Sequence, residues 1–368
     1  MSSFEEVCKS FNKEHKAEII SKGLKQINVE KIPFSSPYLN YITHGGFPRG
    51  KVVEFFGAEG SGKTTSALDV VASAQEVFRA EWEQRCEELS SAKTAKEKAE
   101  YQKVLDNGPL KVVYFDLEHT LDADWAFMLG VNLDDLYLAD FECQSAEEIL
   151  DLLVKLTASD EVGLIVLDSI PYLEPEAQLS QSLEKKEYGG ISKILSAFFR
   201  KITPLLNTTT ASLLLINQMR DSMDPFKMYE TPGGRALKHA CSLRLMFRKG
   251  ELYGKDGNAI PKSSELAYSH KVEVKVEKTK ICKPDRLKGS YILDYYEGID
   301  WVRDLFDICL SEGIIVQSGA WFNFTNVETG EVIDEYKSQG KTKAVQVLKA
   351  NDELLDMYSS YIHNKVIL

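Results

Sequence analysis

A glycine-rich segment carries the clearest chemistry in this sequence. Gly57–Thr65 reads GAEGSGKTT, directly after the apolar run KVVEFF and before a helix-favouring run. Glycines allow a tight loop whose backbone N–H groups face phosphate oxygens, and the following helix adds its positive end. A chance glycine-rich turn is the alternative, but the strand-loop-helix context argues against it. We expect a nucleoside triphosphate to contact Gly57, Ala58, Glu59, Gly60, Ser61, Gly62, Lys63, Thr64 and Thr65.

Charged and hydroxyl groups beside this loop predict nucleotide hydrolysis with Mg²⁺. Lys63 would lie at the β and γ phosphates, and the Thr64 hydroxyl would bind Mg²⁺. Asp168, followed by Ser169, ends the apolar run LIVL and could hold the Mg²⁺ shell. Glu118 follows the run KVVYF, where a carboxylate could polarise an attacking water. Each carboxylate could instead cap a loop, so the prediction depends on their combination.

Alternating elements must position these side chains. The apolar runs are nearly continuous, as in strands covered on both faces of a sheet, and helical runs lie between them. This alternation predicts an α/β fold with a mostly parallel twisted sheet flanked by helices. The expected strands are Lys51–Phe56, Lys111–Phe115, Leu164–Leu167, Leu213–Ile216, Leu243–Phe247 and Val272–Val276. The expected helices are Thr64–Glu76, Ala146–Leu156 and Ile191–Leu206.

Three further segments differ in character from this core. Residues 1–30 are polar and helical with a thin apolar stripe, which predicts an arm that packs on another surface. Residues 76–108 are strongly charged, and we favour a solvated helical hairpin over a binding element there. Residues 298–368 are expected to form a small C-terminal lobe, which leaves residues 31–297 for the nucleotide-binding core.

Composition restricts the class of protein. The chain has 368 residues, is 43% hydrophobic and carries a net charge of −12, so a nucleic-acid partner would have to bind local basic loops. No apolar run is long enough to span a membrane, and the start does not resemble a signal peptide. The six cysteines form no C-x-x-C pair, which favours a reducing, cytoplasmic setting.

Six ordered motifs resemble those of RecA-type recombinases. They are GAEGSGKTT, YFDLEHTLD, LIVLDS, LLLINQMR, TPGGRALKHACSLRL and VEKTK. The similarity covers about residues 32–298 and continues more loosely into the C-terminal lobe. It implies a RecA-like ATPase core with an N-terminal helical polymerisation arm and a small α+β C-terminal lobe. The sequence is divergent from typical bacterial members and fits a phage-encoded version.

The resemblance assigns roles around ATP. Glu118 would activate water, while Asp122 and Trp125 would meet the adenine. Trp125 could instead be an ordinary core aromatic. Gln218 would contact the γ-phosphate and signal its presence to the loop that follows.

Two lysines would complete the ATP site of the adjacent subunit. Lys278 and Lys280 are two residues apart, so on a strand their side chains share a face. By the resemblance, they would reach the neighbouring nucleotide and neutralise charge on its γ-phosphate. A pair of solvated strand lysines is the alternative.

The resemblance also places DNA along two loops, residues 174–190 and 219–232. The second mixes methionine, aromatic and basic residues, which suits a single strand held by its phosphates and wedged between its bases. The residues expected at DNA are Gly190, Lys193, Arg200, Met219, Arg220, Phe226, Lys227, Gly233, Gly234, Arg235 and Lys238.

The implied function is that of an ATP-dependent recombinase in recombination and DNA repair. It would polymerise on single-stranded DNA as a helical filament and exchange strands with a homologous duplex. A RecA-core hexameric helicase is the alternative, but it would use an arginine finger rather than Lys278 and Lys280. A non-hydrolysing assembly switch is disfavoured by Glu118, and a small-molecule kinase by the lack of a substrate lid.

Overall fold

The computed structural model describes residues 3–14, 29–141, 144–179, 190–222, 229–261, 263–264 and 266–367. It separates into two units, Met1–Glu30 and Lys31–Leu368. The first unit contains helix α1 (Phe4–Glu14), which buries none of its residues. Its Phe4 and Val7 side chains are exposed three residues apart, so they share one helix face.

A large mixed sheet forms the centre of the second unit. Within the described residues it has ten strands, in the order β14-β13-β12-β10-β3-β7-β6-β4-β5, with β11 paired to β10. The six strands from β10 to β5 run parallel, whereas β12, β13 and β14 are antiparallel additions. The strands are β3 (Val52–Gly57), β4 (Lys111–Asp116), β5 (Leu136–Ala139), β6 (Val162–Asp168), β7 (Ser212–Gln218), β10 (Leu243–Tyr253), β11 (Ala259–Ile260), β12 (Ser269–Thr279), β13 (Lys288–Asp294) and β14 (Gly298–Ile299).

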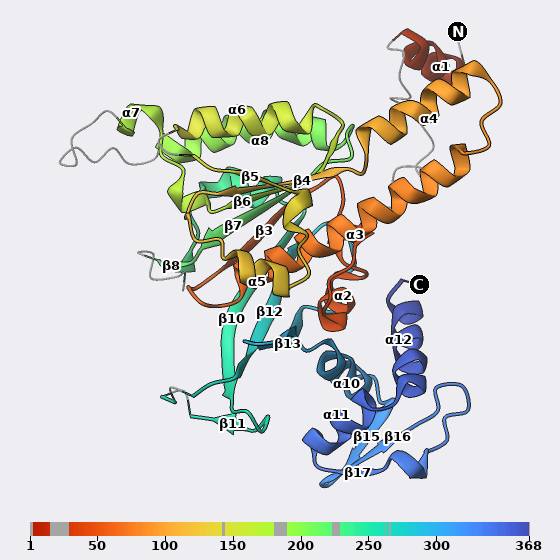
Figure 1. The fold of residues 1–368 in the computed structure, drawn as a ribbon. Helices are drawn as coiled ribbons and strands as arrows, with labels where there is room; N and C mark the ends of the chain where they lie inside the picture. Colours follow the sequence, from red (N-terminus) through yellow and green to blue (C-terminus); the bar gives the residue numbers. More distant parts are fainter. Residues whose placement is uncertain are drawn as a thin grey trace. The chain divides into compact units, whose positions relative to one another are not determined.

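Helices cover both faces of this sheet, as the apolar strands require (Figure 1). On β3, Val53 and Phe55 face one core, which also contains α3 (Lys63–Leu89) and α2 (Pro37–Thr43). Val52 faces the other core, which α6 (Ala146–Thr157), α8 (Gly190–Leu206) and α9 (Gly234–Ala240) complete. The predicted α/β fold with a mostly parallel sheet is therefore confirmed.

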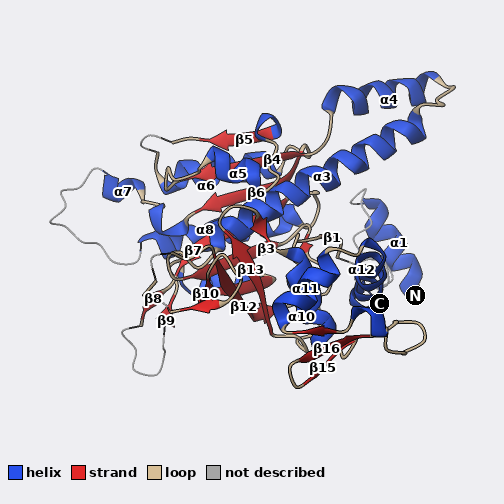
Figure 2. Ribbon diagram, turned by 60° about the horizontal axis from the view of Figure 1, so that its bottom comes forward, coloured by secondary structure: helices blue, strands red, loops and turns tan. Residues whose placement is uncertain are grey.

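Helix α3 is longer than the sequence pattern indicated. It continues thirteen residues beyond the expected end at Glu76, because no glycine or proline interrupts the charged helix formers there. It then pairs with α4 (Ala95–Asn107), which begins at a capping box of Thr94 and Glu97. The Trp82 indole donates to the Val104 carbonyl at 2.9 Å. The two helices form a projecting hairpin (Figure 2).

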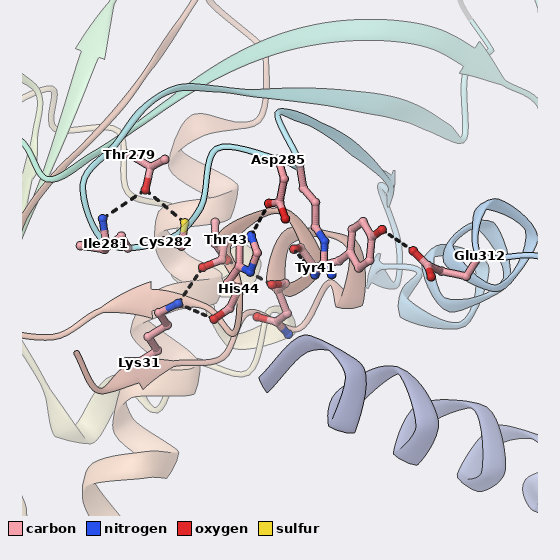
Figure 3. A network of polar contacts seen from close by, with 11 residues as sticks. Lys31, Tyr41, Thr43, His44, Thr279, Ile281, Cys282, Asp285 and Glu312 are labelled. Carbon is pink, nitrogen blue, oxygen red and sulfur yellow. Dashed lines mark hydrogen bonds and ion pairs between the residues drawn. The ribbon is translucent and has the colours of Figure 1, made fainter. Parts of the chain in front are cut away.

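The C-terminal lobe has its own apolar core, centred on Phe306, Phe324 and Tyr358. A polar contact ties this lobe to α2 (Figure 3): the Tyr41 hydroxyl donates to Glu312, which follows α10 (Trp301–Ser311). Arg286, which lies between β12 and β13, covers the Tyr41 ring. The other elements of the lobe are β15 (Ile315–Ser318), β16 (Trp321–Phe324), β17 (Ser338–Gln339), α11 (Lys341–Lys349) and α12 (Asp352–Ile367).

The remaining elements are short. The strands and α-helices are β1 (Lys31–Ile32), β2 (Phe47–Pro48), α5 (Ala123–Met128), α7 (Glu176–Leu179), β8 (Arg220–Asp221) and β9 (Tyr229–Glu230). The described part of the chain also contains the 3-10 helices η2 (Leu133–Asp135), η3 (Ile170–Tyr172) and η4 (Asp334–Tyr336). Among the described residues, no helix combines the length and the apolar character needed to cross a membrane.

Candidate nucleotide and DNA site

The glycine-rich loop connects β3 to α3 in a conformation that depends on its glycines. A Cβ atom added to Gly57 would lie 2.3 Å from the Phe247 carbonyl oxygen, so no larger residue fits. Gly62 is the N-cap of α3 and has a backbone φ of 91°, a value that residues with a Cβ atom rarely adopt. The loop therefore presents backbone N–H groups and the positive end of a 27-residue helix.

The Lys63 ammonium group lies inside this loop. It donates to the Ala58 carbonyl at 2.8 Å, and the Ser61 hydroxyl donates to the same oxygen at 2.7 Å. Burial lowers the pKa of Lys63, while the nearby carboxylates of Asp168 and Glu118 act in the opposite direction. The cation is thus held where phosphate would lie against the loop.

Asp168 at the end of β6 lies directly beside Thr64. Its Oδ2 accepts hydrogen bonds from the Thr64 hydroxyl at 3.1 Å and the Tyr114 hydroxyl at 2.7 Å. Its Oδ1 is buried and accepts no hydrogen bond from the described residues. Burial raises the pKa of Asp168 to about 6. The Thr64 hydroxyl and the Asp168 carboxylate, whose Oδ1 has no hydrogen-bond partner among the described residues, are oxygen groups that suit a divalent cation. The sequence patterns did not single out Tyr114.

Glu118 follows strand β4 by two residues and lies at the same edge of the sheet, since its carboxylate contacts Ser169, directly after β6. The Ser169 hydroxyl donates to Glu118 Oε1 at 2.6 Å, which orients the carboxylate. Asp116 pairs in register with Asp168, and it accepts from the Leu121 N–H at 2.9 Å as a turn cap. The expected carboxylates Glu118, just after β4, and Asp168, at the end of β6, are thus brought together near Lys63 of the phosphate loop.

Gln218 lies next to the phosphate loop through strand register. On the adjacent parallel strands it pairs with Gly57, and the following Met219 N–H donates to the Gly57 carbonyl at 3.1 Å. The Gln218 side chain is half-buried. A displacement of Gly57 in the phosphate loop would therefore displace Gln218 and Met219, where the 219–232 segment begins.

A buried ion pair, which the sequence patterns had not identified, joins β3 to β10 beside the contact between β3 and β7. Arg244 on β10 donates to Glu54 on β3, and both side chains are buried. The Asn217 amide donates to Glu54 Oε1 and to the Pro232 carbonyl, each at 2.9 Å. The signal available in the sequence was a charged residue inside each of two apolar strands, KVVEFF and LRLMF.

The two residues expected at the adenine have ordinary structural contacts as well. Asp122 is the N-cap of α5, and its Oδ1 accepts from the Trp125 N–H at 2.9 Å. The Trp125 ring is half-buried and packs on the core that contains α3. Both residues lie on the segment that follows Glu118. Their roles at adenine stay predictions.

Lys278 and Lys280 lie together at the C-terminal end of α9. Lys278 donates to the Lys238 carbonyl and to the His239 carbonyl at 3.2 Å, and Lys280 donates to His239 at 3.1 Å. Burial is the main cause that lowers the pKa of Lys278. The two ammonium groups thus bind the carbonyl groups at the C-terminal end of α9, where the helix dipole is negative. Within the described residues, neither ammonium group donates a hydrogen bond to the phosphate loop of the same chain.

The expected DNA-binding residues fall into three groups. Lys193 and Arg200 are exposed on α8, which begins at Gly190. Met219 lies between β7 and β8, and the next residue, Arg220, pairs with Glu230 where β8 meets β9, at the base of the second loop. Phe226 and Lys227 lie outside the described residues. The remaining positions lie at or near α9: Gly233, Gly234, Arg235 and Lys238.

A basic surface that the sequence patterns missed lies on the strands next to Lys278. Arg248, Lys271, Lys275 and Lys288 line a cavity of about 350 Å³ on one face of β10, β12 and β13, with Glu273 among them. The excess of positive charge makes this face a candidate for a polyanion, in a chain whose net charge is −12.

Family models match almost the whole chain. The RecA N-terminal domain matches residues 2–80 and 87–300, and the RecA C-terminal domain matches residues 303–367. The interruption at 81–86 falls in the outer half of α3, within the projecting hairpin.

Curated relatives show the same similarity. "Protein RecA" of Thermus aquaticus is 31% identical over 361 residues, which cover 96% of this chain and 91% of that protein. "Protein RecA" of Thermotoga sp. (strain RQ2) is 32% identical over 346 residues, covering 92% and 83%. The protein of the same name from Treponema denticola is 30% identical over 344 residues, covering 92% and 71%.

Proposed function

The chain belongs to the RecA family of DNA-dependent ATPases, which act in recombination and DNA repair, and we propose that it binds ATP with Mg²⁺ between subunits of a helical filament on single-stranded DNA. The observation that carries this proposal is the pairing of Gly57 with Gln218. It joins the phosphate loop directly to the segment expected at DNA.

Mg²⁺ would be held by Thr64 and Asp168. The buried Asp168 Oδ1, which accepts no hydrogen bond from the described residues, supports this assignment. When bound, the cation would neutralise charge on the β and γ phosphates. Asp168 must then be ionised, and the hydroxyls of Thr64 and Tyr114 orient it.

Hydrolysis would use groups from two subunits. Glu118, oriented by Ser169, would accept a proton from the attacking water. Lys63 would contact the phosphates of its own subunit's ATP. Lys278 and Lys280 would contact the nucleotide of the adjacent subunit, because their ammonium groups converge at the exposed end of α9.

The ATP state would reach DNA through Gln218. A γ-phosphate beside Gln218 would favour one arrangement of the 219–232 segment, whose ends are fastened by Asn217 and by the pairing of β8 with β9. Cations at Arg220 and Arg235 would contact the DNA backbone. Duplex DNA would contact the C-terminal lobe and the basic face that includes Arg248 and Lys275.

The arm that contains α1 would dock on the neighbouring subunit, since Phe4 and Val7 are exposed on one face.

We place the recombinase activity in the cytoplasm, because the cysteines form no paired motif of the kind found in disulfide frameworks.

The test compares ATP hydrolysis with and without single-stranded DNA, and then images the product by electron microscopy. DNA-stimulated hydrolysis, helical filaments and D-loop formation are expected. A Lys63→Ala variant provides the inactive control. Rings that unwind a forked duplex and form no D-loops would instead favour the helicase.

A further inference from the structure

The Tyr291 hydroxyl lies in the core against the first turn of α3. Tyr291 is on β13 and is 1% exposed. Its Oη is 2.6 Å from the Ser66 Oγ and 3.5 Å from the Gly62 carbonyl oxygen. Ser66 is also fully buried, so each hydroxyl depends on the other for a strong hydrogen bond.

The strand next to Tyr291 packs on the same glycine. Val272 on β12 is the cross-strand partner of Tyr291. A Cβ atom added to Gly62 would lie 3.0 Å from Val272 and 3.1 Å from the Tyr291 Oη. The β12–β13 pair thus leaves room for glycine and little more at the N-terminus of α3.

The two residues that Tyr291 touches enclose the phosphate-binding turn. Gly62 directly precedes Lys63 and Thr64, and Ser66 comes two residues after Thr64. The Ser66 N–H donates to the Gly62 carbonyl at 2.9 Å, so the first hydrogen-bonded turn of the helix joins these two residues. Displacement of Ser66 would therefore move the Lys63 ammonium group, the Thr64 hydroxyl and the N–H groups of the loop together.

We propose that Tyr291 is a positioning residue for the phosphate loop, which acts through its hydrogen bond to Ser66 to set where the first turn of α3 stands against the sheet. Burial raises the pKa of Tyr291 well above its usual value, so the hydroxyl stays neutral and can donate or accept at every working pH. The inference rests on the proposed role of Gly57–Thr65 in binding the nucleotide.

Two substitutions remove the two halves of this hydrogen bond. Tyr291→Phe keeps the ring and its packing, and Ser66→Ala keeps the helix. We expect each to weaken binding of ATP and of ADP roughly tenfold, since a buried hydrogen bond is worth about that factor. The double variant should bind no more weakly than either single one, because both changes remove the same interaction.

Tyr358→Phe is the matched control. Tyr358 is equally buried, but its hydroxyl donates to the Thr325 carbonyl at 2.9 Å within the C-terminal lobe. It should lower the thermal midpoint as Tyr291→Phe does, yet bind ATP with wild-type affinity. In DNA-dependent hydrolysis, Tyr291→Phe should raise KM for ATP more than it lowers kcat.

The measurement is isothermal titration calorimetry of the full-length protein with ATP or ADP in MgCl₂. Equal affinities for Tyr291→Phe and Tyr358→Phe, or additive effects in the double variant, would overturn the inference. If Tyr291→Phe does not fold, wild-type affinity in Ser66→Ala would overturn it as well. Lys63→Ala tests the proposed nucleotide site separately from the role of Tyr291. Wild-type affinity for ATP in Lys63→Ala would mean that the Gly57–Thr65 loop is not the nucleotide site.

Discussion

Replacing Asp168 with asparagine should stabilise the nucleotide-free protein at pH 8 and abolish its Mg²⁺-dependent hydrolysis. The carboxylate is 3% exposed, and its Oδ1 accepts no hydrogen bond from the described residues. Asparagine has nearly the same shape and keeps one oxygen for Tyr114 and Thr64. It removes the buried charge, which is the feature that a cation would need.

The expected gain in the free energy of unfolding follows from the raised pKa of Asp168. Burial is the main cause that raises it from 3.8 to about 6. One pKa unit corresponds to about 1.4 kcal/mol, so ionised Asp168 costs the folded state about 3 kcal/mol. Because the folded pKa is raised, the protonated carboxyl supports folding fully below about pH 4, and this support is lost as the pH rises through about 6. The gain from Asp168→Asn should therefore be about 3 kcal/mol at pH 8 and near zero at pH 4.

The assay is urea unfolding of both proteins in EDTA, at pH 8, pH 6 and pH 4, without nucleotide or DNA. Two spectroscopic probes with coincident transitions are needed before free energies are compared. Asp69→Asn is a matched control, since burial also raises the pKa of Asp69 to about 6. It should give a similar pH-dependent gain and keep Mg²⁺-dependent hydrolysis.

Loss of stability in Asp168→Asn at pH 8 would refute the reasoning, because it would mean that the charge is well compensated in the nucleotide-free protein. A gain that does not change with pH would refute it too. Full Mg²⁺-dependent hydrolysis in this variant would remove Asp168 from the metal site.

Three further outcomes are expected. Glu118→Gln should bind ATP normally while kcat falls by about 10² to 10⁴, the range for loss of a general base; unchanged hydrolysis would exclude Glu118. Gln218→Ala should bind nucleotide with unchanged Kd but lose stimulation of hydrolysis by single-stranded DNA, and full stimulation would contradict the proposed coupling. Arg244→Ala leaves the Glu54 carboxylate buried without its cation, and should lower the free energy of unfolding by about 3–5 kcal/mol in urea titrations; a change under about 1 kcal/mol would show that the pair is hydrated.

Several features could be predicted because they are local. The phosphate loop depends on glycines and a helix start within nine residues, and conformational limits of that kind act between near neighbours. The strands of the sheet follow from continuous apolar runs. The end of α3 was harder to predict, since helix propensity alone continued the helix to Leu89 while the pattern of buried residues ended earlier.

The sequence by itself determined the chemistry at each strand end, the α/β alternation and the family, since these depend on residue type and order. Only the tertiary structure decided which strand ends meet. It placed β3 between β7 and β10, and so joined Glu54 to Asn217 and Arg244, which are 163 and 190 residues away. It likewise joined Ser66 to Tyr291 across 225 residues. Such pairs form because folding buries whole strands together, and a buried polar group then takes whatever partner the sheet order brings to it.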